Sequence, residues 1–156
     1  MDIRNKTILL TGATGGIGRE LAQKLGDQGA TLILVGRSSD ELSNMAKSLP
    51  NSMTVQADLN CEAGLNKLVS AVSNMSIDGL IQAAGLNSFA TIGQLKYDEI
   101  SRMMNTNLIA PMYLSQSLLP QLKQRPSAFI LNIGSTFGSI GFAGFSAYSA
   151  SKFGLR

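Results

Sequence analysis

The amino-acid sequence predicts an α/β domain in which helices cover both faces of a doubly wound parallel sheet. Two observations lead to this prediction. Short apolar, β-prone runs alternate with helical patterns, and a glycine-rich turn joins the first run to the first helix. With 156 residues, of which 44% are apolar and 15% charged, the chain has the size and composition of one folded domain.

The first βαβ unit lies at the N-terminus. Thr7–Leu10 predicts a strand, and Thr31–Val35 predicts a second strand about 30 residues into the chain. Between them a helical pattern places Ile17, Leu21 and Leu25 on one face. Strand, turn, helix and strand in this order predict a right-handed crossover between parallel strands.

The alternation continues to the end of the chain. Ser38 and Glu41 predict a capping box for a second helix that reaches Leu49. The remaining strands are expected over 53–57, 79–82 and 129–133, and the remaining helices over 61–73, 97–124 and from 146 onward. The helical stretch 97–124 should break near Asn105 and bend near Pro111.

Right-handed crossovers then predict a Rossmann-type sheet with the strand order 3-2-1-4-5 in a single domain over residues 1–156. The sequence stops at Arg156 within the last predicted helix, with no glycine cap or turn after it. We therefore expect a domain that is incomplete at its C-terminus and lacks its last strands.

Composition narrows the function. The net charge of +3 comes from scattered basic residues, so the pI of 9.2 is the only indication of a nucleic-acid partner and no motif supports one. No stretch reaches the roughly 18 to 20 apolar residues of a membrane span. The single cysteine, Cys61, indicates a reducing compartment, and we expect a cytoplasmic protein. Without histidine, metal ligation is disfavoured and acid–base chemistry must come from other groups.

The glycine-rich turn between the first strand and the first helix predicts a dinucleotide site. Glycines let the backbone turn sharply and approach a pyrophosphate, and the N–H groups of the helix N-terminus attract the anion. A tight turn without a ligand is the alternative. The residues expected to bind the cofactor here are Gly12, Thr14, Gly15, Gly16, Ile17 and Gly18.

The tip of the second strand favours NADP(H) over NAD(H). An acidic residue at this position would bind the ribose 2′-hydroxyl, whereas a nearby arginine can bind a 2′-phosphate. The sequence has Gly36-Arg37-Ser38, and Asp40 belongs to the first turn of the next helix. Arg37 could also be a solvent-exposed loop residue.

Tyr148 and Lys152 are the best candidates for acid–base chemistry. Their spacing of four places both on one face of the last helix, after the fifth strand. A nearby ammonium stabilises a phenolate, which lets a tyrosine exchange protons. Ser135 lies 13 positions before Tyr148, just past the same strand, where its hydroxyl can bind a substrate carbonyl or form a loop turn.

Several motifs occur together in a fixed order. They are Thr11-Gly12-x-x-x-Gly16-x-Gly18, Ala84-Gly85, Asn107, Ser135 and Tyr148-x-x-x-Lys152. In this order and spacing, the chain resembles the short-chain dehydrogenase/reductase family, in its short single-domain branch, from residue 6 to residue 156. The resemblance implies a reductase or dehydrogenase that moves a hydride between NADP(H) and a carbonyl or alcohol.

The resemblance also implies a role for each matching residue. Tyr148 would donate and accept the proton, Lys152 would hold the nicotinamide ribose and favour the phenolate, and Ser135 would orient the substrate oxygen. Asn107 would anchor a water in a proton relay. Asp58 would contact the adenine, and Leu59, Ala84 and Gly85 would also contact the cofactor.

Two related alternatives remain. Gly15 also gives the spacing Thr-Gly-x-x-Gly-x-x-Gly of the extended sugar-nucleotide epimerases, but the 13-residue spacing from serine to tyrosine disfavours that branch. A non-catalytic dinucleotide sensor would keep the glycine loop without needing Tyr148 and Lys152.

One departure from the family, Gln82-Ala83 in place of two asparagines, affects the bracing of the central strand more than the chemistry.

The remaining apolar residues predict a substrate pocket and an interface. Phe137, Phe142 and Phe145 either line an apolar pocket or anchor their loop in the core. The helix faces around Leu108, Leu114 and Leu118 must be buried, either within the chain or against a second subunit. The resemblance favours a homodimer or homotetramer.

Overall fold

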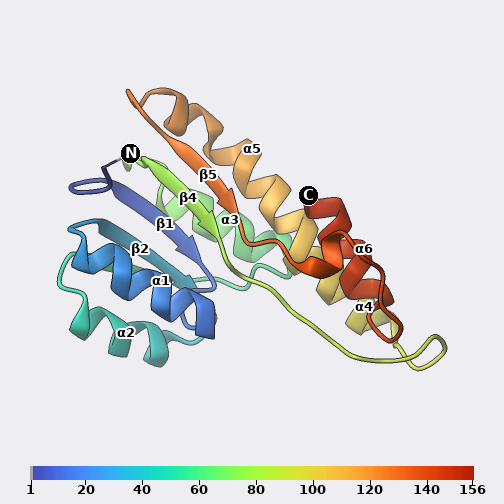
Figure 1. The fold of residues 1–156 in the computed structure, drawn as a ribbon. Coiled ribbons are helices and arrows are strands. Elements are labelled where there is room, and N and C mark those ends of the chain that lie inside the picture. Colours follow the sequence, from blue (N-terminus) through green and yellow to red (C-terminus); the bar gives the residue numbers. More distant parts are fainter. Residues whose placement is uncertain (1) are drawn as a thin grey trace.

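The computed structural model describes residues 2–156 and contains a five-stranded parallel sheet (Figure 1). The strand order is β3-β2-β1-β4-β5, which confirms the order predicted from the sequence. The strands are β1 Thr7–Thr11, β2 Thr31–Gly36, β3 Ser52–Gln56, β4 Gly79–Gln82 and β5 Phe129–Asn132. Because all neighbours pair in parallel, the carboxyl ends of all five strands meet at one edge of the sheet.

Helices lie on both faces of this sheet, and the edge strand β5 stays partly exposed. α1 (Gly16–Asp27) and α2 (Ser39–Ser48) lie on one face, and α3 (Glu62–Ala71) and α5 (Ala110–Lys123) lie on the other (Figure 1). Successive side chains of a strand point to opposite faces, so β1 and β2 contribute to two separate core clusters. The cluster under α1 and α2 includes Ile8, Leu10, Leu32, Leu34 and Leu42. The cluster under α3 and α5 includes Leu9, Ile33, Val35, Leu65, Leu80 and Leu114.

The long helical stretch changes its winding where the sequence predicts a break. α4 (Tyr97–Met104) continues into a π-helical turn, η1 (Asn105–Ile109), where the N–H of Ala110 donates to the carbonyl of Asn105. Pro111 has no N–H group and cannot make the usual bond to the carbonyl four residues earlier. The helix therefore stays continuous through a wider turn, which is a common form of local defect in an α-helix.

The last elements lie at the carboxyl edge of the sheet. β5 leads through a short 3-10 turn, η2 (Thr136–Gly138), and a loop into α6 (Ser146–Leu155). α6 packs against η2, α4 and the π turn. The segment between β4 and α4 runs out from the same edge toward the loop before α6 (Figure 1).

The apolar faces of the long helix are largely buried within the chain. Leu114 and Leu118 are at most 1% exposed because α5 packs on the sheet, so they are not available to a second subunit. The large apolar side chains of η1 and α5 that are exposed are Ile109, Met112 and Leu119.

One predicted inward residue of α1 is exposed. Ile17 was expected to share a buried face with Leu21 and Leu25, but its side chain is 59% exposed. The buried positions of α1 are the small residues Gly18 and Ala22, which allow the helix to lie close to the sheet.

A buried ion cluster stabilises the amino-terminal edge of the sheet. Asp78 is 2% exposed and accepts a hydrogen bond from the Thr7 N–H at 2.9 Å. Its carboxylate also contacts Arg125 at 2.8 Å and Lys6 at 3.4 Å. Burial raises the pKa of Asp78, but the Thr7 hydrogen bond and the charges of Arg125 and Lys6 outweigh it, so this pKa lies below its ordinary value.

Candidate active site

The glycine loop packs backbone against backbone. Gly12 has a φ of +67°, and a Cβ at this position would lie 2.6 Å from the Cα of Ala84. A Cβ at Gly18 would lie 2.0 Å from the Gly12 carbonyl oxygen. The loop can therefore approach the end of β4 and the first turn of α1 only with glycine at these two positions.

A cleft of about 310 Å³ opens at the carboxyl edge next to this loop. It crosses the ends of β1, β2, β3 and β4 and is bounded by α4 and the π turn. Eight residues that the sequence predicts for the cofactor line it together: Gly12, Thr14, Gly15, Arg37, Asp58, Leu59, Ala84 and Gly85. Gly16, Ile17 and Gly18 form the start of α1 and are not part of the lining.

The charged groups of the cleft differ in whether they have partners. Glu41 forms an ion pair with Arg19 at 3.3 Å, and Asp58 accepts the Asn60 N–H at 3.0 Å. Arg37 is exposed, and its guanidinium has no hydrogen bond or ion pair within residues 2–156. The cleft thus presents the unpaired cation of Arg37, while Glu41 is ion-paired and one oxygen of Asp58 is hydrogen-bonded.

Only one of the two hydrogen bonds of the predicted capping box of α2 is present. The Ser38 hydroxyl accepts the Glu41 N–H at 3.3 Å, as expected. The Glu41 carboxylate does not return the bond to the Ser38 backbone, because it pairs with Arg19 of α1 instead. Arg19 also donates to the carbonyl of Thr14 at 2.8 Å, which ties α2 to the glycine loop.

Tyr148 and Lys152 lie on consecutive turns of α6. Nζ of Lys152 is 6.0 Å from the centre of the Tyr148 ring and donates to the carbonyl of Ile133 at 2.8 Å. Nζ also lies 3.9 Å from the position that a Cβ on Gly85 would occupy. Because Gly85 lines the cleft, the ammonium group lies beside the cleft. The lysine is 6% exposed, and this burial lowers the pKa of its ammonium group.

Ser135 lies on the same side of the molecule as the lysine. Ser135 and Lys152 line a second hollow of about 290 Å³ just past β5. The hydroxyl of Ser135 accepts the Phe137 N–H at 3.2 Å and starts the 3-10 turn, so the turn-forming role that the sequence left open is present. The same hydroxyl still has its own proton to donate.

Asn107 holds a backbone segment. It is fully buried, accepts the Leu86 N–H at 2.7 Å, and donates from Nδ2 to the Leu86 carbonyl at 2.8 Å and to Ser151 Oγ at 3.0 Å. Both N–H bonds of the amide are therefore used within the protein. The side chain links α6 to the segment that follows Ala84 and Gly85, and so fixes one wall of the cleft.

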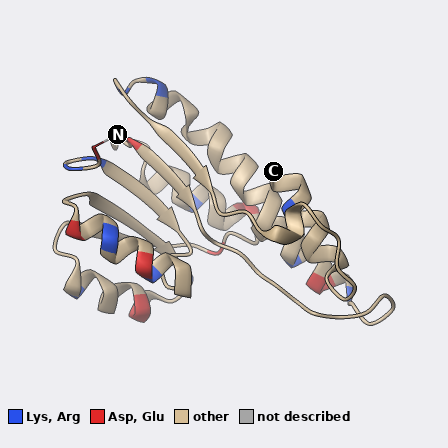
Figure 2. Cartoon of the chain, in the orientation of Figure 1, with Lys and Arg blue, Asp and Glu red and all other residues tan. Residues whose placement is uncertain are grey.

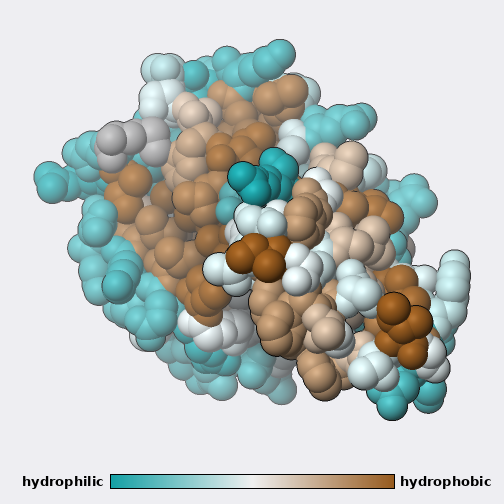
Figure 3. Space-filling model, turned by 45° about the vertical axis from the view of Figure 1, so that its right-hand side comes forward, coloured by the Kyte–Doolittle hydropathy of each residue, from teal (hydrophilic) through white to brown (hydrophobic). Residues whose placement is uncertain are grey.

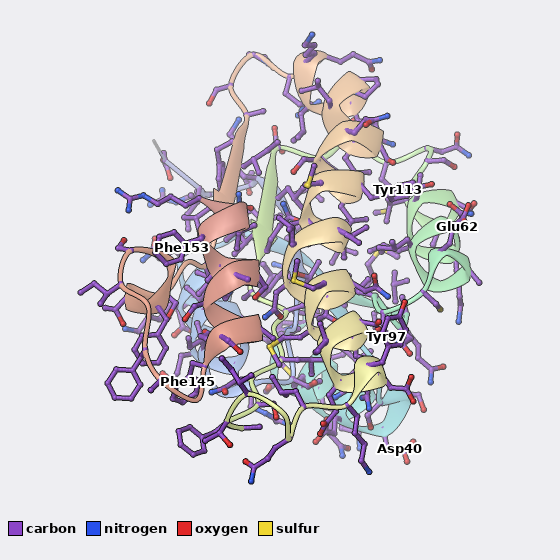
Figure 4. All side chains as sticks on the ribbon, turned by 90° about the vertical axis from the view of Figure 1, so that its right-hand side faces the viewer. Asp40, Glu62, Tyr97, Tyr113, Phe145 and Phe153 are labelled. Atoms are coloured by element: carbon purple, nitrogen blue, oxygen red, sulfur yellow. The ribbon has the colours of Figure 1, made fainter. Side chains whose placement is uncertain are left out.

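An aromatic cluster surrounds Tyr148. The rings of Phe137 and Phe145 each lie 6.2 Å from the tyrosine ring, and Phe137 stacks on Phe142 at 5.5 Å. Phe145 also meets Phe89 of the segment after β4 at 5.2 Å. Figure 4 shows Phe145 at the start of α6, beside the segment after β4, and Figure 3 shows apolar side chains gathered on the α6 end of the molecule.

The central strand has a brace of its own. Gln82 Nε2 lies within hydrogen-bond distance of Asn132 Oδ1, Ser115 Oγ and the Pro111 carbonyl, at 2.9, 3.0 and 3.2 Å. One longer amide side chain thus connects β4 with β5 and α5. This arrangement braces the strand even though Gln82-Ala83 departs from the asparagine pair of the resembling family.

Other classes of site find no support in residues 2–156. No group of three or more His, Cys, Asp or Glu side chains is placed to hold a metal ion there. None of the helices in that range is long and apolar enough to cross a membrane. Lys and Arg are interspersed with Asp and Glu over several elements (Figure 2).

The family model for short chain dehydrogenases matches residues 6–156. With this match and the Rossmann-type sheet, the chain belongs to the short-chain dehydrogenase/reductase family of oxidoreductases. No other class of protein is needed to account for the order of its motifs.

Relatives and solved structures agree with this family. The ketoacyl reductase HetN of Nostoc sp. is 36% identical over 98% of this chain, and the 3-oxoacyl-[acyl-carrier-protein] reductase FabG of Rickettsia prowazekii is 30% identical over 99%. A metagenomic short-chain oxidoreductase solved in complex with NADP has a TM-score of 0.91 at 27% identity, covering 99% of this chain and 72% of its own. The chain spans 55% of the Nostoc protein and 64% of the Rickettsia protein.

Two residues that line the cleft were not predicted from the sequence. Arg102 of α4 lines the cleft with Thr106, although neither belongs to a motif. Its side chain reaches the cleft because α4 continues into the π turn, where Asn105 Nδ2 donates to the carbonyl of Asn60, in the segment after β3, at 3.1 Å. No local pattern in the sequence signals that contact.

Proposed function

We propose that the protein is an NADP(H)-dependent oxidoreductase that interconverts a carbonyl group and an alcohol, with Tyr148 as the general acid and base. The observation that carries the proposal is the position of Lys152. Its buried ammonium lies 6.0 Å from the centre of the Tyr148 ring and 3.9 Å from the position of a Cβ on Gly85, so one cation can act on both the proton donor and a bound cofactor.

The residues of the cleft fit a dinucleotide. The close backbone approach at Gly12 and Gly18 leaves the N-terminus of α1 open beside the cleft, which suits a pyrophosphate. Arg37 at the tip of β2 can bind a 2′-phosphate through its planar fork, which favours NADP(H). When bound, the nicotinamide would supply or accept the hydride.

The protein's own groups would manage the proton and the substrate oxygen. Ser135 would donate its hydrogen to the carbonyl oxygen, while Tyr148 delivers or removes the proton on that oxygen. Lys152 would hold the ribose and stabilise the phenolate. Asn107 would keep the Ala84–Leu86 wall in place, and a relay water near it remains a prediction.

The substrate side is apolar. The rings of Phe137, Phe142 and Phe145 next to Tyr148 favour a substrate with an apolar portion beside its carbonyl. Two of the relatives are named as ketoacyl reductases, which supports a 3-oxoacyl group as the first substrate to examine. A cytoplasmic location and assembly as a homodimer or homotetramer remain predictions.

The proposed activity can be tested by measuring the transfer of a labelled hydride from NADPH to a carbonyl substrate. The protein would be incubated with NADPH carrying deuterium at C4 of the nicotinamide and with 3-oxoacyl thioesters of increasing chain length. We expect NADPH to be consumed and deuterium to appear on the carbinol carbon of the product. If the protein binds NADPH tightly but transfers no deuterium to any carbonyl, the non-catalytic sensor is the better description.

A further inference from the structure

A second unpaired guanidinium lines the cofactor cleft. Arg102 lies in the last turn of α4, and its side chain has no hydrogen bond or ion pair within the described part of the chain, residues 2–156. The acidic residues at the start of the same helix do not neutralise it. Glu99 accepts the Lys96 N–H at 3.1 Å, and Asp98 forms no ion pair with Arg102.

The position of Arg102 differs from that of Arg37. Arg37 follows β2, where the ribose of a dinucleotide would lie. Arg102 belongs to the wall that Asn105 joins to Asn60, at the segment after β3. If the pyrophosphate lies on the glycine loop and the ribose at the tip of β2, the adenine must extend toward β3 and this wall.

The guanidinium group of Arg102 is chemically suited to contact an adenine ring. A guanidinium is planar and weakly hydrated, and it binds the face of an aromatic ring well. The two carboxylates of the cleft, Glu41 and Asp58, are already engaged by Arg19 and by the Asn60 N–H. An incoming base is therefore a partner that Arg102 lacks within the described residues.

We infer that Arg102 binds the adenine ring of the dinucleotide and is a cofactor-binding residue in addition to Arg37. This inference rests on the proposed function, since it takes the cleft to be a dinucleotide site. It predicts that Arg102 contributes equally to NADPH and NADH, whereas Arg37 acts on the 2′-phosphate alone.

The test uses binding, not activity. ADP-ribose, NADPH and NADH would each be titrated by calorimetry into the wild type and into Arg102→Ala. We expect the dissociation constants of all three to rise by a similar factor, about 3- to 30-fold. Arg102→Lys should recover little, because an ammonium keeps the charge and loses the plane. Lys123→Ala removes one positive charge from the far end of α5 and should change none of the three.

Each outcome has a distinct meaning. Equal weakening of all three ligands that Arg102→Lys does not restore supports the adenine contact, whereas equal weakening that Arg102→Lys restores would assign Arg102 to the shared pyrophosphate and overturn the inference. Weakening of NADPH alone, restored by Arg102→Lys, would assign Arg102 to a phosphate and overturn the inference. Wild-type affinities in Arg102→Ala would overturn it as well. If the wild type binds none of the three ligands, the proposed dinucleotide function fails together with the inference.

Discussion

The buried charged groups at the two edges of the sheet differ in how completely their charge is satisfied by partners within the protein. At the amino-terminal edge, Asp78 is surrounded by Arg125, Lys6 and the Thr7 N–H, so its charge is satisfied inside the protein. At the carboxyl edge, Lys152 is nearly as buried but makes one hydrogen bond, to the Ile133 carbonyl, within residues 2–156. A satisfied charge stabilises the fold, whereas an incompletely satisfied one is available to a ligand at some cost in stability.

The largest expected effect is on turnover at the carboxyl edge. Tyr148→Phe keeps the ring packed against Phe137 and Phe145 but removes the proton donor. We expect the rate of NADPH-dependent carbonyl reduction to fall about 10²- to 10⁴-fold, with the affinity for NADPH nearly unchanged. Tyr113→Phe is the matched control, because that hydroxyl bonds Asn66 on the surface. Full activity in Tyr148→Phe would remove the tyrosine from the mechanism.

The next largest effect concerns the glycine loop. In Gly18→Ala, the new methyl group would collide with the carbonyl of Gly12, and we expect a loss of about 3 kcal/mol or more in the free energy of unfolding. The control is Gly16→Ala, two positions earlier, where a Cβ would meet nothing within 4 Å. Denaturant unfolding without cofactor measures both. Equal stabilities would show that the loop does not pack as described.

Removing the satisfied charge should destabilise the protein. Asp78→Asn leaves Arg125 and Lys6 without their shared partner, and we expect a loss of about 1 to 3 kcal/mol at pH 7. The folded-state pKa of Asp78 lies below the unfolded value of about 3.9. The stabilisation is therefore complete above that pH and is lost as the pH falls through the folded-state pKa. Urea unfolding should show a smaller difference in the free energy of unfolding between wild type and Asp78→Asn at pH 3 than at pH 7. An equal difference at the two pH values would contradict the ion cluster.

Removing the buried charge of Lys152 should change the free energy of unfolding in the opposite direction and by a smaller amount. Lys152→Met keeps the aliphatic stem and removes the ammonium, whose pKa is lowered by burial. We expect stability at pH 7 to stay level or rise by up to about 1 to 2 kcal/mol, while activity is lost. The gain should shrink as the pH rises through the lowered folded-state pKa toward the unfolded value of about 10.4, because the wild-type lysine becomes neutral. A clear destabilisation at pH 7 would show that its charge is satisfied after all.

The sequence alone predicts the features that depend on local pattern. The strands, the glycine loop and the placement of Tyr148 and Lys152 on one helix follow from apolar periodicity, glycine positions and a spacing of four, and the strand order follows once the strands are joined by right-handed crossovers. These signals lie within a few residues of one another, so no knowledge of packing is needed to read them.

Features that depend on distant contacts were not predictable. Arg102 belongs to the cleft because Asn105, just after α4, bonds to the carbonyl of Asn60 in the segment after β3, 45 positions earlier in the chain. Leu114 and Leu118 looked equally suited to a core or an interface, because the pattern of a helix face does not say what covers it. The π turn at Asn105 likewise reflects the packing of Asn107 against Leu86 as well as Pro111.

The central claim is that the carboxyl edge binds NADP(H), and thermal unfolding with added nucleotide tests it most directly. NADPH and NADH would be compared at equal concentrations, with Arg37→Ala alongside the wild type. We predict a higher melting temperature with NADPH than with NADH, with a stabilisation of about 2.7 kcal/mol at a hundredfold excess over the dissociation constant. Arg37→Ala should remove the difference between the two nucleotides. A larger shift with NADH would exclude Arg37 from the site, and no shift with either nucleotide would contradict the claim itself.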